Sequence, residues 1–179
     1  MVEEKVVDSK ESDKRSRAVS GERVRASRLS EIKSGNETRI DTGIGELNRV
    51  LGGGLVKGSL TLISGEPGIG KSTIIIQAAA QIAQRCGTVL YVTGEESAEQ
   101  IKMRADRVCQ GALDNLFLLA ETNIENIVQV QEELRPEFLI IDSIHTMYTD
   151  DLESAPGSVS QVRACGNELM KIGKGKNIP

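Results

Sequence analysis

Aromatic residues are nearly absent from this chain of 179 residues, which contains no tryptophan, two tyrosines and two phenylalanines. Its hydrophobic fraction of 39% is still enough for a core, so we expect that core to be aliphatic. No apolar run approaches the ~20 residues of a membrane-spanning helix, and the N-terminus lacks the apolar centre of a signal peptide. We therefore expect a cytoplasmic protein with no membrane partner.

Cysteine is also scarce, since Cys86, Cys109 and Cys165 are widely spaced and form no C-x-x-C pair. This spacing suits a reducing compartment and argues against a zinc site or a disulfide framework. We expect all three to be small buried hydrophobic residues. A formal net charge of −4 argues against binding nucleic acid through bulk positive charge.

Residues 1–38 differ in composition from the rest, with nine Lys/Arg, eight Asp/Glu and few aliphatic side chains. Such a segment buries too little apolar surface to offset the entropy lost on ordering. We interpret it as a charged, flexible linker or tail. Its arginines at 23, 25 and 28 could contact a phosphate backbone, but a solvated tail is the simpler interpretation.

Residues 65–72 match the phosphate-binding pattern G-x-x-x-x-G-K-[ST]. The glycines allow backbone N–H groups to point at phosphate oxygens, while Lys71 can contact the β- and γ-phosphates and Ser72 can ligate Mg²⁺. We expect a strand before the loop at 59–64 and a helix after it at 73–84. The predicted ATP contacts are Gly65, Glu66, Pro67, Gly68, Ile69, Gly70, Lys71, Ser72 and Thr73. The Glu66 side chain either assists ATP hydrolysis or faces solvent, and we favour the solvent-facing position.

The remaining pattern alternates strands and helices. We expect three further strands, a short helix at 44–51, and later helices that begin after Ser97 and Asn123. This alternation predicts an α/β fold with a mainly parallel sheet flanked by helices, and ligands at the carboxyl edge of that sheet. The expected strands are 88–93, 116–119 and 138–141, and the expected later helices end near 108, 134 and 171.

Carboxylates follow two of these strands. Asp142 comes directly after the apolar strand at 138–141, the Walker B pattern, where it can hold Mg²⁺ through water and orient Ser72. Glu95 and Glu96 follow the strand at 88–93, and either could orient and deprotonate the water that attacks the γ-phosphate. The sequence does not choose between them. An acidic turn without a catalytic role is the alternative.

Two cationic side chains and one histidine are weaker candidates. Arg104 and Lys102 belong to the helix after Ser97, where either could border adenine or belong to a solvated face. His145, the only histidine, lies three residues after Asp142 and could sense the γ-phosphate. Alone it forms neither a catalytic triad nor a metal site.

Several segments together resemble the RadA (Sms) family of RecA-like ATPases. The resemblance rests on residues 39–58, on the loop 65–73, and on the stretches 91–97, 100–105 and 141–147. It implies an ATP-dependent DNA repair and recombination factor that binds single-stranded or branched DNA, promotes branch migration as a hexameric ring and works beside a recombinase. It also implies Lys71 and Ser72 at the phosphates, Asp142 at Mg²⁺, and Glu95 or Glu96 beside the attacking water.

The sequence departs from that family pattern in several ways. The four-cysteine zinc module is absent, so we expect zinc only in a longer form. The core at 39–179 stops before a central strand, which would leave the strands at 60–64 and 138–141 with unpaired edges. The Lys-Asn-Arg-Phe-Gly motif and the Lon-protease-like domain are also absent, and His145 replaces the usual glutamine. The alternatives are a relative of the circadian-clock ATPases, or a nucleotide-binding assembly module without turnover.

Overall fold

The computed structural model describes residues 26, 28–31 and 38–179. The chain divides into two compact units, Met1–Gly35 and Asn36–Pro179. In the first unit, the described residues include a short 3-10 helix, η1 (Leu29–Glu31). The linker predicted at 1–38 otherwise lies almost entirely outside the described residues and stays a prediction. The second unit carries the candidate site.

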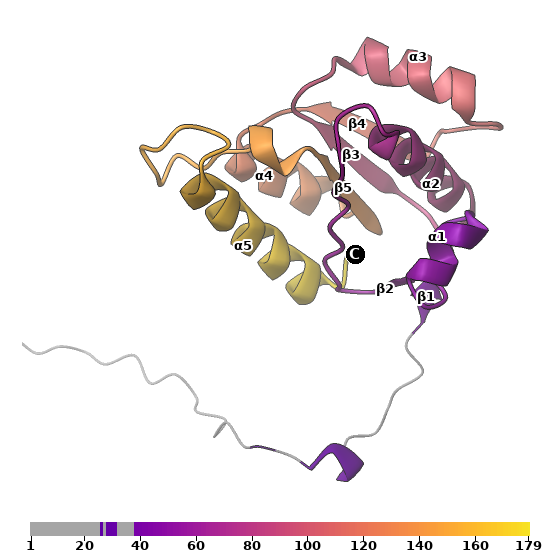
Figure 1. Ribbon diagram of the computed structural model, residues 1–179, viewed down its shortest axis with the longest axis horizontal. Helices are drawn as coiled ribbons and strands as arrows, with labels where there is room; N and C mark the ends of the chain where they lie inside the picture. The colour runs from indigo at the N-terminus through magenta and orange to yellow at the C-terminus, as the bar shows by residue number, and fades with distance from the viewer. Residues whose placement is uncertain (1–25, 27, 32–37) are drawn as a thin grey trace, which may run out of the picture. The chain divides into compact units, whose positions relative to one another are not determined.

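The second unit is built around a three-stranded parallel sheet in the order β4-β3-β5 (Figure 1). The strands are β3 (Val89–Thr93), β4 (Leu116–Ala120) and β5 (Phe138–Asp142). In the register of the central strand, Thr93 lies opposite both Ala120 and Asp142. The carboxyl ends of all three strands therefore meet at one edge, as predicted.

Helices cover both faces of this sheet, which confirms the α/β fold (Figure 1). Helices α2 (Lys71–Arg85) and α3 (Ala98–Val108) pack on one face, and α4 (Ile124–Leu134) and α5 (Val159–Lys176) on the other. Because side chains alternate along a strand, Val89 and Tyr91 enter the first layer, while Leu90 and Val92 enter the second. Both layers are mainly aliphatic.

Predicted helix boundaries agree closely with the structure where a capping residue fixes them. The Ser97 side chain accepts a hydrogen bond from the Gln100 N–H, and Gln100 Oε1 accepts one from the Ser97 N–H, which forms a capping box. The Asn123 side chain caps α4 by accepting a hydrogen bond from the Asn126 N–H. Helix α5 continues five residues beyond the predicted end at Lys171 and stops at Asn177, which takes a left-handed conformation.

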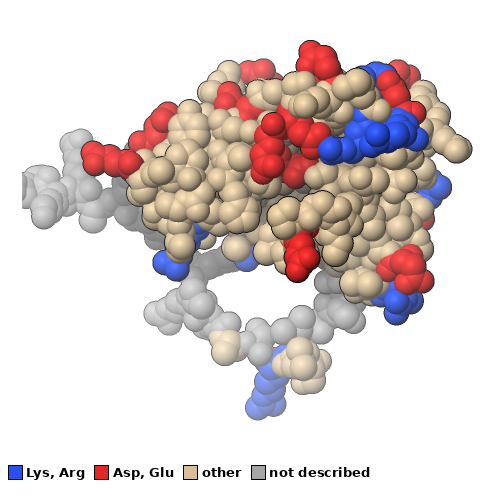
Figure 2. Space-filling view, turned by 45° about the horizontal axis from the view of Figure 1, so that its top comes forward, with Lys and Arg blue, Asp and Glu red and all other residues tan. Residues whose placement is uncertain are grey.

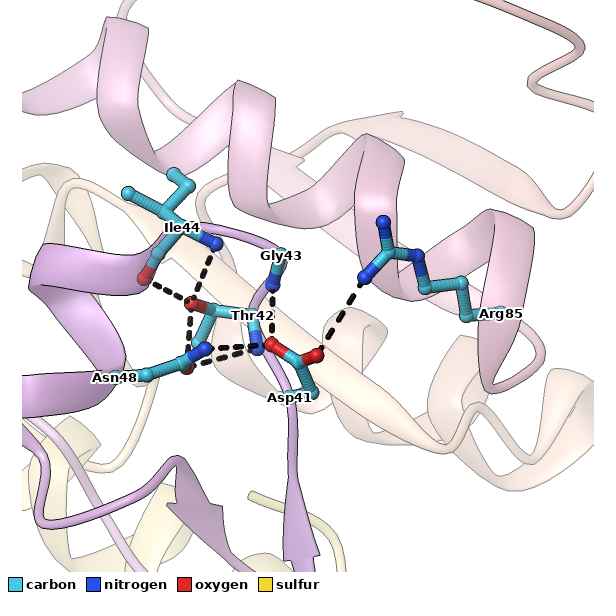
Figure 3. A network of polar contacts seen from close by, with 6 residues as sticks. All are labelled: Asp41, Thr42, Gly43, Ile44, Asn48 and Arg85. Atoms are coloured by element: carbon cyan, nitrogen blue, oxygen red, sulfur yellow. Dashed lines mark hydrogen bonds and ion pairs between the residues drawn. The ribbon is translucent and has the colours of Figure 1, made fainter.

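A small antiparallel ladder, β1 (Arg39–Ile40) with β2 (Leu55–Val56), precedes the phosphate loop and encloses the predicted short helix, α1 (Gly45–Val50). Polar contacts fix the turn between β1 and α1 (Figure 3). The Asn48 amide donates to the Asp41 carboxylate, whose other oxygen lies 3.5 Å from an Arg85 guanidinium nitrogen on α2. Hydrogen bonds from the Gly43 N–H and from Asn48 hold the pKa of Asp41 below its usual range.

The strand predicted at 59–64 is wrong. These residues run without ladder hydrogen bonds, and the side chains of Leu60 and Leu62 are 57% and 77% exposed. A strand needs a neighbour to share its hydrogen bonds, and no strand of the described part pairs with this segment. On the outer edge of β5, the Leu139 N–H donates to the Pro179 carbonyl at 3.1 Å, so the last residues reach that edge.

The cysteine prediction is correct for one thiol of three. Cys165 is buried between α5 and the sheet, Cys109 is partly buried, and Cys86 is exposed at the end of α2. Cys86 lies at the C-terminal cap of that helix, where no further element covers it. None of the helices in the described part could cross a membrane. The cytoplasmic location stays a prediction.

Thiol accessibility tests this arrangement. Under native conditions we expect a thiol reagent to modify Cys86 at once and Cys165 only after unfolding, because burial shields Cys165 and raises the pKa of its thiol, which lowers the reactive thiolate fraction. Cys86→Ser should remove the fast phase of modification and leave the modification of Cys109 and Cys165 unchanged. Rapid native modification of Cys165 would contradict the packing of α5.

Candidate nucleotide site

The phosphate loop has the backbone that the motif requires. Gly68 and Gly70 take φ values of 78° and 102°, a region that favours glycine. The helix α2 begins at Lys71 immediately after the loop, so the unbonded N–H groups of its first turn belong to the loop region. The partial positive charge of a helix N-terminus favours an anion there. The helix predicted at 73–84 is thus confirmed and begins two residues earlier.

Lys71 is held inside this loop. Its Nζ donates to the carbonyl oxygens of Gly65 and Glu66, both at 2.9 Å. Each residue from 61 to 70 is exposed, and the Glu66 side chain has no ion pair within the described part of the chain. The ammonium therefore lies at an open loop where an incoming phosphate can reach it.

Asp142 ends β5 and is tied to the central strand. Its Oδ2 accepts a 2.6 Å hydrogen bond from the Tyr91 hydroxyl, and its carbonyl accepts from the Gly94 N–H at 3.0 Å. Burial, together with the Asp142 carboxylate, raises the pKa of Tyr91 far above its usual range. Tyr91 is fully buried, whereas Asp142 is partly exposed, so the carboxylate retains access to solvent.

The two glutamates after β3 have different partners. Glu95 is exposed, and its Oε1 accepts a hydrogen bond from the Ser143 hydroxyl at 2.6 Å. The Glu96 Oε2 forms an ion pair with Arg104 Nη2 at 2.6 Å, with only 28% of its side chain exposed. The Thr93 hydroxyl fixes the turn by donating to the Glu96 carbonyl and accepting from the Glu96 N–H.

Arg104 and Lys102 differ although they lie on one helix. Lys102 pairs with Asp106 on the exposed surface of α3, which is the predicted solvated face. The Arg104 side chain is 22% exposed, and its Nη1 is buried without a hydrogen-bond partner in the described chain. A solvated face does not describe Arg104. Its predicted contact with adenine stays a prediction.

Gly94 allows the turn to pack closely against the segment after β5. A Cβ at Gly94 would lie 2.0 Å from Thr146 Oγ1 and 3.0 Å from a methyl carbon of Thr122. Thr146 belongs to η2 (Ile144–Thr146), and its hydroxyl donates to the Ser143 carbonyl at 2.8 Å. His145, in the same short helix, is exposed, and its predicted sensor role stays a prediction.

The structure brings together the acidic half of the predicted site, which consists of Glu95, Glu96 and Asp142 at the ends of β3 and β5. No hydrogen bond or ion pair in the described residues joins Lys71 or Ser72 to Asp142. The same residues contain no cluster of three His, Cys, Asp or Glu that could hold a metal ion. One carboxylate and one hydroxyl suit Mg²⁺, which keeps several waters and binds mainly through substrate phosphates.

Sequence reasoning missed three residues of this site: Tyr91, Ser143 and Gly94. Tyr91 carried a usable signal, since it is a phenol in an otherwise apolar strand of a chain with very few aromatics. Ser143 and Gly94 carried none, because their contacts come from segments about 50 residues apart.

Substitution of Gly94 tests whether this packing positions the site. Gly94→Ala should displace Thr146 and with it Ser143, which lowers stability by roughly 1–3 kcal/mol and any turnover that depends on Glu95. Gly166→Ala is the matched control, because a Cβ there meets nothing within 4 Å and alanine favours the helix. Equal thermal stability of the wild-type and Gly94→Ala proteins would contradict the close approach.

Comparison with known proteins shows which family the chain belongs to. The sequence profile of the family described as "AAA domain" matches residues 25–175. The chain is 52% identical over 153 residues to "DNA repair protein RadA" of Bacillus subtilis (strain 168), covering 84% of this chain and 33% of that protein.

Two further relatives carry the same name. The Listeria monocytogenes protein is 47% identical over 176 residues, covering 97% of this chain and 38% of that protein. The Streptococcus pneumoniae protein is 50% identical over 162 residues, covering 90% of this chain and 38% of that protein. The chain thus spans about a third of the length of these relatives. Together with the loop and strand geometry, these matches show that the chain belongs to the AAA domain family and is related over most of its length to the bacterial DNA repair protein RadA.

Proposed function

We propose that this protein binds ATP with Mg²⁺ at residues 65–73 and hydrolyses it as part of DNA repair. The observation that carries the proposal is the glycine loop that closes on Lys71 at the start of α2, in a chain whose β5 ends in a carboxylate. These two features supply the cation, the N–H groups and the metal ligand that a triphosphate needs.

Each group has a separate task in this proposal. Lys71 leaves the two loop carbonyls and donates to the β- and γ-phosphates, while the N–H groups of the loop and of the first turn of α2 bind their oxygens. Ser72 and Asp142 would hold Mg²⁺, which neutralises charge on the phosphate oxygens when bound.

We propose Glu95 rather than Glu96 as the group that orients and deprotonates the attacking water. Glu95 is exposed and is held by a single hydrogen bond from Ser143, so its other oxygen can accept from water. Glu96 is occupied by Arg104 in a mostly buried ion pair. A carboxylate oxygen already held by a guanidinium has fewer lone-pair positions left to accept a hydrogen bond from water.

The nucleic-acid part of the proposal is supported by the similarity to DNA repair protein RadA. We propose that the complete protein binds single-stranded or branched DNA as a hexameric ring, uses the ATP cycle for branch migration and works with a recombinase. Figure 2 shows acidic and basic side chains interspersed, with no continuous basic surface on that face. The DNA contacts would then come from local groups or from residues outside this chain.

Lys71→Ala tests nucleotide binding. Loss of one charge-assisted phosphate contact, worth roughly 1.5–3 kcal/mol, should weaken ATP binding by at least about tenfold. The fold should survive, because the carbonyls that Lys71 contacts lie in an exposed loop. Equilibrium binding of a fluorescent ATP analogue measures the effect, and Lys174→Ala on the exposed end of α5 is the control. Unchanged affinity in a folded Lys71→Ala protein would disprove the assignment.

Paired amide substitutions in the complete protein test the choice of base. Glu95→Gln should keep ATP binding and slow phosphate release by roughly 10²–10⁴. Glu96→Gln should slow it far less but lower the unfolding free energy by roughly 1–3 kcal/mol, because Arg104 loses its partner. The reverse ranking would assign the base to Glu96. No phosphate release by the wild-type protein would instead favour an assembly module that binds ATP without turnover.

A further inference from the structure

Tyr91 is a buried polar side chain of β3 whose hydroxyl binds directly to a carboxylate at the carboxyl edge of the sheet. It lies opposite Ile140 on β5, and Asp142 follows two residues later on the same face of the sheet. Its hydroxyl spans 51 residues of sequence to donate to Asp142 Oδ2 at 2.6 Å. Such a short distance is typical of a charge-assisted hydrogen bond to a carboxylate.

Packing alone does not account for the hydroxyl. The Tyr91 ring is fully buried in the aliphatic layer beneath α2 and α3, where phenylalanine would fill the same space. A buried phenol needs a hydrogen-bond partner, and the partner here is the carboxylate at the end of β5 rather than a backbone carbonyl. Asp142 does not need Tyr91 in the same way, because it is partly exposed and water can solvate it.

The hydrogen bond also restricts the carboxylate. An ionised carboxylate has two oxygens and about four lone-pair positions, and Tyr91 occupies one position on Oδ2. This fixes the rotation of the carboxylate group and leaves Oδ1 for other ligands. Residues that hold a metal ligand in place commonly contribute about 10–100-fold to metal affinity.

We propose that Tyr91 is a positioning residue that orients Asp142 to receive the Mg²⁺ that accompanies ATP. The inference rests on the proposed function, since it assigns Asp142 to the metal. Tyr91 touches neither the metal nor the nucleotide and acts through Asp142 alone. Its removal therefore changes the Mg²⁺ requirement more than the affinity for the nucleotide itself.

The chain supplies a matched control, because it contains two tyrosines. Tyr148 is partly buried after η2, and no hydrogen bond from its hydroxyl to a described residue is found. Tyr148→Phe therefore makes the same chemical change away from the proposed site. Binding of a fluorescent ATP analogue to the complete protein, titrated with Mg²⁺, compares the wild-type, Tyr91→Phe and Tyr148→Phe proteins.

We expect Tyr91→Phe to raise the half-saturating Mg²⁺ concentration roughly tenfold or more. Analogue binding in EDTA and turnover at saturating Mg²⁺ should stay close to wild type, and Tyr148→Phe should match wild type throughout. An unchanged Mg²⁺ requirement in Tyr91→Phe overturns the inference while leaving the proposed function intact. Equal losses of binding with and without Mg²⁺ also overturn it, because they indicate a purely structural role.

A second measurement covers the case in which Tyr91→Phe fails to fold. The near-ultraviolet tyrosine absorption of the Tyr148→Phe protein should shift when Mg²⁺ is added to the ATP complex, because the Tyr91 hydrogen-bond acceptor becomes a metal ligand. Absence of that shift, with Mg²⁺ binding established, overturns the inference. A wild-type protein that binds no ATP analogue overturns the proposed function and this inference together.

Discussion

Burial of β3 on both faces is the constraint on which the rest of the structure depends. Each of its five residues is buried, and the first four alternate between the layer under α2 and α3 and the layer under α4 and α5. Both of its edges are paired, with β4 on one side and β5 on the other. The strand thereby fixes the spacing of two helical layers and aligns the ends of three strands.

The candidate site follows from where this strand ends. Parallel strands in register place Thr93 beside Asp142, so the acidic turn after β3 and the segment after β5 emerge together. Short polar side chains then hold the two segments in place: Thr93 fixes the turn, Ser143 holds Glu95, and Thr146 packs against Gly94. Each of these is a single hydrogen bond or packing contact, but together they give the adjacent carboxylates Glu95 and Glu96 different surroundings.

The phosphate loop does not depend on strand pairing. It depends on local backbone geometry, with glycines at positive φ and a helix that begins at Lys71. Its preceding segment, 59–64, is not paired with the sheet and exposes Leu60 and Leu62. The loop conformation therefore does not require ladder pairing of this segment. No hydrogen bond or ion pair of the described residues joins Lys71 or Ser72 to Asp142.

Local signals in the sequence determined much of this protein. The glycine loop, the caps Ser97 and Asn123, and the apolar runs that became β3, β4 and β5 each depend on residues close together in the chain, and the structure agrees with them. The alternation of strands and helices likewise gave the fold class correctly. Only the tertiary structure decided the rest. The sequence could not show that 59–64 stays unpaired, that Cys86 is exposed, or that Arg104 holds Glu96 while Ser143 holds Glu95. Ladder pairing, burial and side-chain partners at the strand ends are set by segments distant in sequence, which local patterns do not encode.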